Sequence, residues 1–321
     1  MSDINLLKPV AVFEQLFERQ IRLEDRRNQE HAAISVAVNV LQSCHGSSLV
    51  KIGNTEVICG AKVKVLPDAV DAGSVVANVE LTSLSNRTIH PNTGITKEAQ
   101  FLSSALQRLI TNSVCPDTAK DLNIYSETSS QQPVGSYVIK LDAVVLHDDG
   151  CLLDACTSAA LATLLSLSWP QLFSPKEVSG GDGDARESVS KQYRPTVPTR
   201  MRTLSVSDWP VTFSFCFVPL TVAQHCGISP LICQPSRREL TLWDTDAGPG
   251  YITVSSLSKN VLELSMTNAF LPGLSSKLKP TERSSQVDGL SPWKALLEAS
   301  SAYALEMKTA IQDALGTASI K

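Results

Sequence analysis

The sequence has few aromatic residues, no excess of basic charge and no long apolar run. These shortages exclude an aromatic core, nucleic-acid binding over the whole surface and a membrane span, respectively. Aromatic residues make up 5% of the 321 residues against 43% hydrophobic residues, so the core must be mainly aliphatic. No apolar run reaches the roughly 18 residues of a membrane span, so no membrane partner is expected. The net charge of −4 excludes a protein that grips nucleic acid over its whole surface.

Cysteine and histidine are present, but without the spacing of a metal site. Eight cysteines in a chain of this length do not make a dense disulfide framework, and no Cys-x-x-Cys pair occurs. Cys44 beside His45, and His147 near Cys151 and Cys156, have the residue types of metal ligands without a zinc spacing. We predict reduced, mostly buried thiols in an intracellular protein without a secretory signal, and no bound metal.

Common catalytic and cofactor motifs are also missing. No Gly-x-Ser-x-Gly elbow is present to carry a nucleophilic serine. Gly53-Asn54-Thr55 lacks the further glycines and the following helix of a phosphate-binding loop, so it is predicted to be a turn. These patterns predict no catalytic residue and no cofactor.

The N-terminal half has the period-two alternation of β-strands. Ile34–Val40 alternates, and the β-rich runs Ser48–Ile52 and Val57–Val63 flank Gly53-Asn54, which predicts a hairpin. Asn78–Leu81 is predicted to be a further short strand. The same reasoning predicts a strand at 211–218 and a hairpin formed by 240–243 and 251–254, with polar loops at 85–96 and 271–290.

Helical periodicity appears in three places. Pro9–Ile21 is predicted to be an opening helix, and Lys97–Val114 a helix with Thr96 as its N-cap. The last helix is predicted to begin at Pro292 and to end at Gly316, with residues that include Leu297 on its buried face. The glycine-rich, aperiodic stretch 174–203 is predicted to be a mobile surface insertion. The whole is a mixed α+β chain, with an N-terminal helix and arm at 1–27 and a single domain at 28–321.

The most informative stretch joins a buried strand at 138–146 to a helix of small residues through the turn Asp148-Asp149-Gly150. A helix that starts just after a strand presents free backbone N–H groups and is a ready anion site. No Lys or Arg lies between Lys140 and Lys176, however, and the turn itself is acidic. The geometry would suit a phosphate, but the local charge does not.

Several arginines lie in polar segments. Arg26, Arg27 and Arg87 have the side chain best suited to phosphate contacts, although solvated surface charge is the plainer interpretation. The short basic clusters Arg200-Met201-Arg202 and Arg237-Arg238 are more typical of solubility or interface residues than of a nucleic-acid patch.

Four blocks stand out in order along the chain: Gly46–Gly60; Ser85-Asn86-Arg87 followed by Glu98-Ala99-Gln100; Asp148–Thr157; and Leu231–Ser236. Together they resemble the RNase-PH-like ring subunits of the eukaryotic RNA exosome, over roughly residues 9–315. The run Arg22–Arg26 is similar to an Arg-Pro-Asp-Gly-Arg run of these relatives, without its proline and glycine.

The resemblance implies an RNase-PH-like fold, with mixed sheets and packed helices in a ribosomal protein S five domain-two-like arrangement. It implies a heterodimer with another RNase-PH-like subunit inside a six-member ring, capped by proteins with oligonucleotide-binding folds. RNA would thread the ring to a separate catalytic ribonuclease for 3′-to-5′ processing, including that of ribosomal RNA. Arg87, then Arg26 and Arg27, are the implied RNA contacts. The implied location is the nucleus and nucleolus, and also the cytoplasm.

The resemblance also implies that this chain is not an enzyme. Active relatives place Gly-Thr-Arg or Gly-Ser-Arg at the start of the helix to hold phosphate, and the corresponding residues are taken to be Ala155–Ser158, which include no arginine. Gln234 stands where many relatives keep an aspartate. Losing a phosphate-binding cation or a proton donor typically costs on the order of a hundredfold in rate. Two alternatives stay open: an active phosphate-dependent exoribonuclease that works as a heterodimer, and an unrelated α+β enzyme or binding module.

Overall fold

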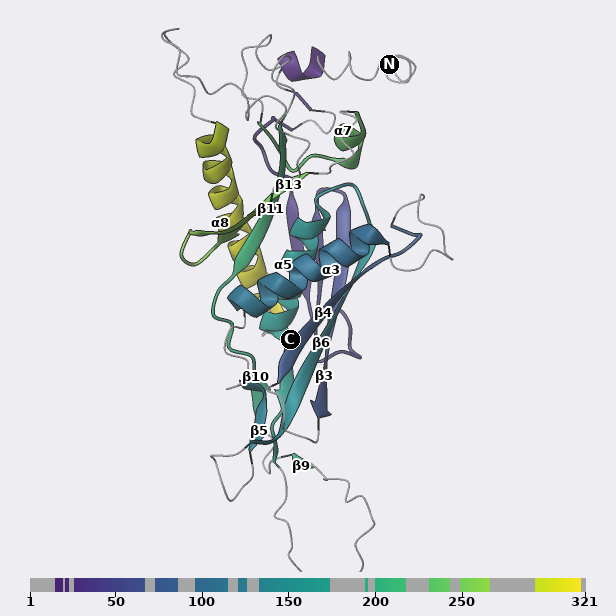
Figure 1. Cartoon of the computed structure of the whole chain (residues 1–321), viewed down its shortest axis with the longest axis vertical. Helices are drawn as coiled ribbons and strands as arrows, with labels where there is room; N and C mark the ends of the chain where they lie inside the picture. The colour runs from purple at the N-terminus through teal and green to yellow at the C-terminus, as the bar shows by residue number, and fades with distance from the viewer. Residues whose placement is uncertain are drawn as a thin grey trace, which may run out of the picture.

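The alternating N-terminal half forms a mixed six-stranded sheet in the computed structural model (Figure 1). Strand β4 is parallel to β6, and the other pairings are antiparallel. The strands, in spatial order, are β1 (Ile34–Val38), β2 (Gly46–Ile52), β3 (Thr55–Leu66), β6 (Pro133–His147) and β4 (Ser74–Leu81), and β5 (Asn123–Tyr125) pairs with β6. The structure describes residues 15–19, 21–22, 26–66, 73–85, 96–114, 121–125, 133–173, 194–195, 200–217, 231–242, 249–265 and 292–318.

The predicted hairpin is confirmed. Ile52 pairs with Thr55, so Gly53 and Asn54 form a two-residue loop between β2 and β3. Gly53 has a φ of 58°, the left-handed value that glycine adopts without steric cost at the first loop position of a type II′ turn.

Helix α5 (Leu152–Ser166) lies between this sheet and a second, four-stranded antiparallel sheet (Figure 1). Every residue from Leu152 to Leu164 is buried, which suits a helix that is apolar or small on all sides. The second sheet has the order β12 (Leu231–Cys233), β11 (Pro210–Phe217), β13 (Gly250–Ser255) and β14 (Val261–Ser265).

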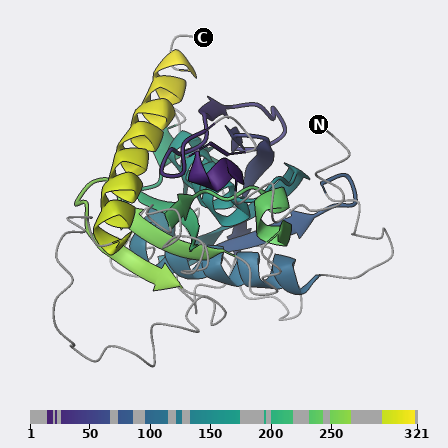
Figure 2. The ribbon, with the colours of Figure 1, turned by 90° about the horizontal axis from the view of Figure 1, so that it is seen from above.

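Two amphipathic helices complete the layers. Helix α3 (Lys97–Leu109) packs on β4 and runs into a π-helical turn, η1 (Ile110–Val114); the Thr96 hydroxyl accepts a hydrogen bond from Ala99 N, as predicted for its cap. Helix α8 (Pro292–Ala318) packs on β1 and the second sheet, and seen from above it lies along a different side of the fold from α3 (Figure 2).

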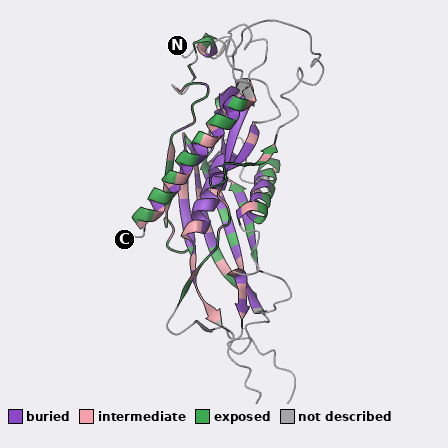
Figure 3. Ribbon diagram, turned by 90° about the vertical axis from the view of Figure 1, so that its left-hand side faces the viewer, coloured by how far each residue is buried: buried purple, intermediate pink, exposed green. Residues whose placement is uncertain are grey.

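Two predictions for α8 are wrong. The helix continues past Gly316 to Ala318, because Gly316 does not take the positive φ with which a glycine ends a helix. Leu297 is 43% exposed, because the buried stripe of α8 instead follows Leu296, Tyr303 and Met307; the exposed stripe is visible along its outer side (Figure 3).

The predicted strand at 240–243 is also wrong. Residues Arg237–Leu242 form helix α7, while β13 pairs with β11 and β14. Ser236 accepts a hydrogen bond from Glu239 N, and the Glu239 carboxylate accepts one from Ser236 N. This reciprocal capping box starts a helix where apolar alternation alone suggested a strand.

Part of the predicted insertion 174–203 is paired structure. β9 (Arg194–Pro195) pairs with β8 (Leu172–Phe173), and β10 (Met201–Thr203) pairs with β7 (Ser168–Pro170). Residues 174–193 and 196–199, like the predicted loop at 271–290 and most of the opening helix, lie outside the described residues; Gln15–Glu18 are helical.

The thiols agree with the sequence reading as far as the structure describes them. Cys59, Cys151, Cys156, Cys216 and Cys233 are buried and unpaired, and Cys44 is half-buried. Burial raises the pKa of Cys59 and of Cys233 to about 12, so neither is a thiolate at neutral pH. Within the described ranges, no helix is both long and apolar enough to cross a membrane.

The outer edge of β4 is closed by side chains from α3. Gln107 Oε1 accepts a hydrogen bond from Ala77 N (2.7 Å) and Gln107 Nε2 donates one to Val75 O (2.8 Å), as a neighbouring strand would. Ser103 Oγ accepts another from Val79 N (2.9 Å). Occupied edge groups cannot template pairing with a further strand.

We expect Gln107→Ala to lower the free energy of unfolding by about 1 kcal/mol and to promote self-association, since it leaves two edge groups unpaired. Urea denaturation and light scattering measure both effects. Gln100→Ala, at an exposed position of the same helix, is the matched control. Equal behaviour of the two variants would show that Gln107 does not protect the edge.

Candidate functional site

The strand-to-helix turn predicted as an anion site packs tightly on the segment that follows β12. Gly150 has a φ of 96°, and a Cβ built there would lie 2.5 Å from Pro235 O. Cys151 follows at a φ of 55°, and its thiol donates to Pro235 O at 3.7 Å. We call this junction the α5 corner: residues 148–154 together with residues 233–239.

The hairpin β2–β3 holds the turn in place. Thr55 Oγ1 donates to Gly150 O (2.5 Å) and accepts from Asp149 N (3.1 Å). Asn54 Nδ2 donates to Asp149 Oδ2 (3.0 Å). Asp148 Oδ1 accepts from Gly150 N (3.1 Å), so one acidic side chain of the turn serves its own backbone.

Asp154 is a fully buried carboxyl group in the first turn of α5. Its Oδ2 accepts hydrogen bonds from Ser214 N and Ser214 Oγ, both at 2.8 Å, and from Gln234 Nε2 at 3.3 Å. Its Oδ1 has no hydrogen-bond partner among the described residues. Burial raises the pKa of Asp154 to about 7, although the bonds from Ser214 and Gln234 oppose this shift.

Gln234 connects this carboxyl to the segment that precedes β1. It is fully buried with a φ of 46°, and its Oε1 accepts from Ala32 N (2.8 Å) while its Nε2 donates to Asp154. An ionised aspartate has no N–H to donate, so an aspartate at this position would place a second carboxylate against Asp154. The amide of Gln234 can both accept from Ala32 N and donate to Asp154, whereas an ionised carboxylate cannot.

Arg22 anchors the arm from the other side of the corner. Its guanidinium makes a two-pronged pair with Glu239, with Nε to Oε1 at 2.9 Å and Nη2 to Oε2 at 2.5 Å, and both side chains are 1% exposed or less. It also donates to Cys233 O (2.6 Å) and Gln234 O (2.9 Å). Burial alone would lower the pKa of Arg22, but the Glu239 hydrogen bond and charge outweigh it, so the pKa is raised.

Arg237 is a second basic group at the corner. It forms an ion pair with Asp148, and its backbone N donates to Asp149 O (3.0 Å). Arg26 donates to Gln234 O (3.3 Å) and Glu30 O (3.4 Å). The cations missing from the α5 segment are thus brought to the corner by the fold, but the protein's own carboxylates and carbonyls occupy Arg22, Arg26 and Arg237.

The assignment of Ala155–Ser158 to the helix start is wrong. α5 begins at Leu152, so these residues lie one turn further in, where all are buried and Thr157 Oγ1 donates to Leu153 O (2.7 Å). The residues that do open the helix, Gly150–Leu152, also include no arginine.

The predicted RNA contacts are placed in part. Arg26 is half-buried and Arg27 exposed, side by side on the arm, where Arg27 N donates to Glu30 Oε2 (3.1 Å). Arg87 lies outside the described residues; Ser85, two positions before it, accepts a hydrogen bond from Asp148 N (3.3 Å). RNA contact by these arginines stays a prediction. The sequence alone assigns no site role to Arg22, Asp154 or Glu239, although Ser236-x-x-Glu239 is a visible capping-box signature.

The histidines named with the cysteines have structural contacts. His147 Nδ1 lies 2.8 Å from Asn54 O, and His45 Nδ1 accepts from Val63 N (3.3 Å). No cluster of three or more His, Cys, Asp or Glu side chains that suits a metal occurs within the described ranges.

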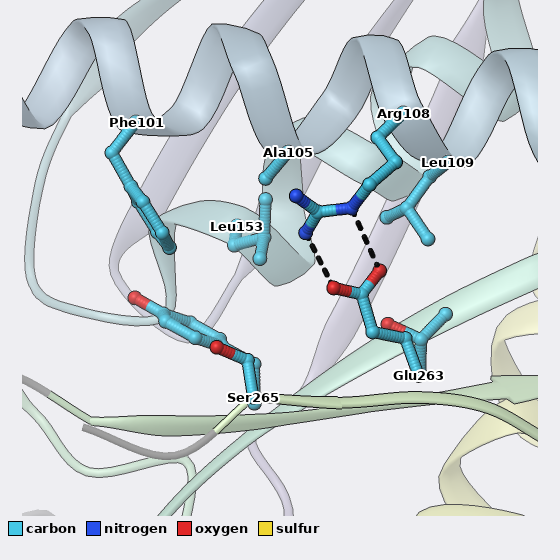
Figure 4. A pocket seen from close by; sticks show the side chains of 9 residues that line it. Phe101, Ala105, Arg108, Leu109, Leu153, Glu263 and Ser265 are labelled. Carbon is cyan, nitrogen blue, oxygen red and sulfur yellow. Dashed lines mark hydrogen bonds and ion pairs between the residues drawn. The ribbon is translucent and has the colours of Figure 1, made fainter. Parts of the chain in front are cut away.

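A cavity of about 10 Å³ lies between α3 and the second sheet, and Leu153 of α5 is among the residues that line it (Figure 4). Arg108 of α3 reaches across it to Glu263 of β14, with Nε to Oε2 at 3.3 Å. The cavity has room for little more than one water molecule, so it is not a substrate site.

Comparisons with known proteins agree with this architecture. Residues 30–170 match the family described as "3' exoribonuclease family, domain 1". The exosome complex component Rrp42 of Archaeoglobus fulgidus is 30% identical over 227 residues, which cover 70% of this chain and 73% of that protein. The Rrp42 of Sulfurisphaera tokodaii is 33% identical over 171 residues, which cover 52% of this chain but only 59% of that protein.

Solved structures confirm the predicted fold. The chain superposes on a chain of the "archaeoglobus fulgidus exosome with RNA bound to the active site" with a TM-score of 0.66 at 21% identity, covering 96% of this chain and 99% of that one. A chain of an "Archaeal exosome core" gives a TM-score of 0.62 at 20% identity, with 97% and 99% covered.

Asp154 makes stability depend on pH. Its folded-state pKa of about 7 lies above the ordinary value of 3.8, so its protonation stabilises the fold at low pH, and this contribution is lost as pH rises towards 7. Asp154→Asn keeps an acceptor for Ser214 and cannot ionise. We expect the stability of the variant relative to the wild type to rise by about 1.4 kcal/mol per pH unit between pH 4 and 7.

Chemical denaturation at several pH values measures this difference, and Asp142→Asn, at an exposed site, is the matched control. A relative stability of Asp154→Asn that does not change with pH would mean that Asp154 is not a protonated, buried acid.

Removing the Arg22 side chain, which anchors the arm, should destabilise the fold. We expect Arg22→Met to lower the free energy of unfolding by about 3–5 kcal/mol, because Glu239 is left buried without its counter-charge. Arg27→Met, at an exposed neighbouring position, should change it by no more than about 0.5 kcal/mol. Adding Glu239→Gln to Arg22→Met should recover part of the loss, since glutamine keeps an acceptor for Ser236 N. Similar denaturation midpoints for Arg22→Met and Arg27→Met would refute the anchor.

Proposed function

The chain belongs to the RNase-PH-like family of exosome subunits, and from that premise we propose that it is a non-catalytic subunit of an exosome core ring. In this role it pairs with another RNase-PH-like subunit within a six-member ring that carries cap proteins with oligonucleotide-binding folds. It guides RNA towards a separate catalytic ribonuclease and so supports 3′-to-5′ RNA processing and degradation.

One observation supports the proposal that the subunit is non-catalytic: the arginines at the α5 corner are bound by carboxylates and carbonyls of the same chain. Phosphorolysis needs a cation that holds phosphate where the helix begins, yet Arg22 is saturated by Glu239 and two carbonyls, and Arg237 pairs with Asp148. A phosphate entering here would have to break these pairs and face the acidic turn.

Among the described acids, Asp154 is the one whose pKa is raised towards neutrality, and it has no access to a substrate. Asp154 has a pKa of about 7, but it is fully buried beneath the arm. A general acid must come within hydrogen-bonding reach of the group it protonates. The side chain therefore serves the packing of α5 against β11 and Gln234.

RNA contact in this proposal falls to Arg87, Arg26 and Arg27. A mildly acidic subunit suits such a ring, because a few cations facing a shared channel create a local positive potential without making each subunit basic. The run Leu153–Thr157, Leu-Asp-Ala-Cys-Thr, further favours the paralogue known as ribosomal-RNA-processing protein forty-three, with function in the nucleus, nucleolus and cytoplasm and with ribosomal RNA among the substrates.

The test has two parts, catalysis and assembly. We expect the purified chain, alone or with RNase-PH-like partner subunits, to contribute no phosphate-dependent release of nucleoside diphosphates from RNA. Release that falls when this chain carries Asp154→Asn, but not Asp142→Asn, would establish the alternative of an active heterodimeric exoribonuclease. A wild-type chain that stays monomeric with every RNase-PH-like partner would refute the ring role.

RNA contact is measured by crosslinking in the assembled ring. The triple variant Arg26→Ala, Arg27→Ala and Arg87→Ala should lower crosslinking to this chain several-fold, whereas Lys97→Ala, at the exposed start of α3, should not. Unchanged crosslinking of the triple variant would remove these arginines from the RNA path.

A further inference from the structure

Among the residues that the structure describes, no helix covers one face of the six-stranded sheet. Helices α3 and α5 pack on the other face, which carries the buried residues of β3, β4 and β6. The alternate residues of these strands point the opposite way. On that side Lys62, Lys64 and Lys140 are exposed. We call these three lysines the lysine face.

The lysines are close together, and no ion pair with a described residue neutralises them. Lys62 of β3 is directly opposite Lys140 of β6, which places their Cβ atoms about 5 Å apart, and Lys64 follows two residues along β3. None of them forms an ion pair with a described residue. The nearest acid on the same side is Asp142, two residues from Lys140 and opposite Gly60, and it is also without an ion pair. Like charges directly opposite each other on a sheet destabilise it.

Exposed aliphatic residues border the lysine face. Val76 of β4 is in register with Lys140 and is 47% exposed, and Leu66 at the end of β3 is 46% exposed. Val138, opposite Lys64, is half-buried. The described strands place no aromatic side chain beside these residues on this face for a base to stack on, and a phosphate chain would leave the aliphatic residues in water.

We propose that the lysine face, with Val76 and Leu66, is the docking surface for a neighbouring RNase-PH-like subunit that presents carboxylates beside apolar side chains. This inference rests on the proposed ring role. Apolar contact with a charged, complementary border is the usual anatomy of a subunit interface. The partner's carboxylates neutralise the opposed Lys62 and Lys140, so a pairing that costs stability in the free chain becomes favourable in the assembly.

The free chain and the assembly should respond in opposite directions to charge reversal. Lys140→Glu places a glutamate opposite Lys62, so the isolated chain should gain about 1–3 °C in Tm. The same change puts a like charge against the partner's acids, so the dissociation constant of the subunit pair should rise. With Lys62→Glu and Lys140→Glu together the rise should be about 100-fold or more. A substitution at a residue with a merely structural role would not raise the Tm of the isolated chain and weaken the subunit pair at the same time.

Native mass spectrometry and titration of the co-expressed subunits measure assembly, and thermal denaturation of the isolated chain confirms that each variant folds. Lys97→Glu, which makes the same charge change at the start of α3 over the opposite face, is the control and should leave assembly unchanged. Loss of assembly with retained or raised Tm supports the proposal.

Other outcomes overturn it. Assembly of the double variant with wild-type affinity would refute the docking surface while leaving the ring role intact. Intact assembly with reduced RNA crosslinking would instead assign the lysine face to RNA. If the wild-type chain forms no pair with any RNase-PH-like subunit, the proposed function fails, and this inference fails with it.

Discussion

Both sheets bury a face against α5, and small residues on this helix let β2 approach its backbone closely. The close approach is visible at Gly46 of β2, where a Cβ would lie 2.8 Å from Thr163 O. One polar group in this layer is satisfied by the helix itself, since Ser48 Oγ donates a hydrogen bond to Ala159 O at 2.8 Å. Because the helix cannot shift in such a packed layer, its first turn is fixed at the junction of the arm, the hairpin and the second sheet.

That fixed position determines what the corner can do. The start of a buried helix would suit an anion, but here it meets the carboxyl of Asp154, the amide of Gln234 and the paired Arg22 and Glu239. The charges are balanced inside the chain, and they tie together segments more than 200 residues apart. The corner therefore connects the arm to the domain, and this connection is compatible with the proposed role in assembly.

Local signals predicted much of the fold. Gly53-Asn54 between two β-rich runs and Thr96 before an apolar stripe are complete within a few residues, and both are confirmed. Signals that depend on tertiary contacts were missed. Arg22 lies in a charged run that looks like solvated surface, and only the fold brings Glu239 to it. The strand assigned at 240–243 followed apolar alternation over a capping box, and Leu297 was assigned to the core because its stripe neighbours are equally apolar.

Gly150 shows that packing alone can fix the backbone shape of this turn. Any side chain there would collide with the carbonyl of Pro235, and the left-handed backbone would add strain, so folding alone excludes replacement whether or not a reaction takes place. Charged neighbours face no such steric limit. During evolution, a protein of this kind can therefore lose catalytic groups one at a time while it keeps the backbone bend. For this reason, backbone similarity is weak evidence of catalytic activity.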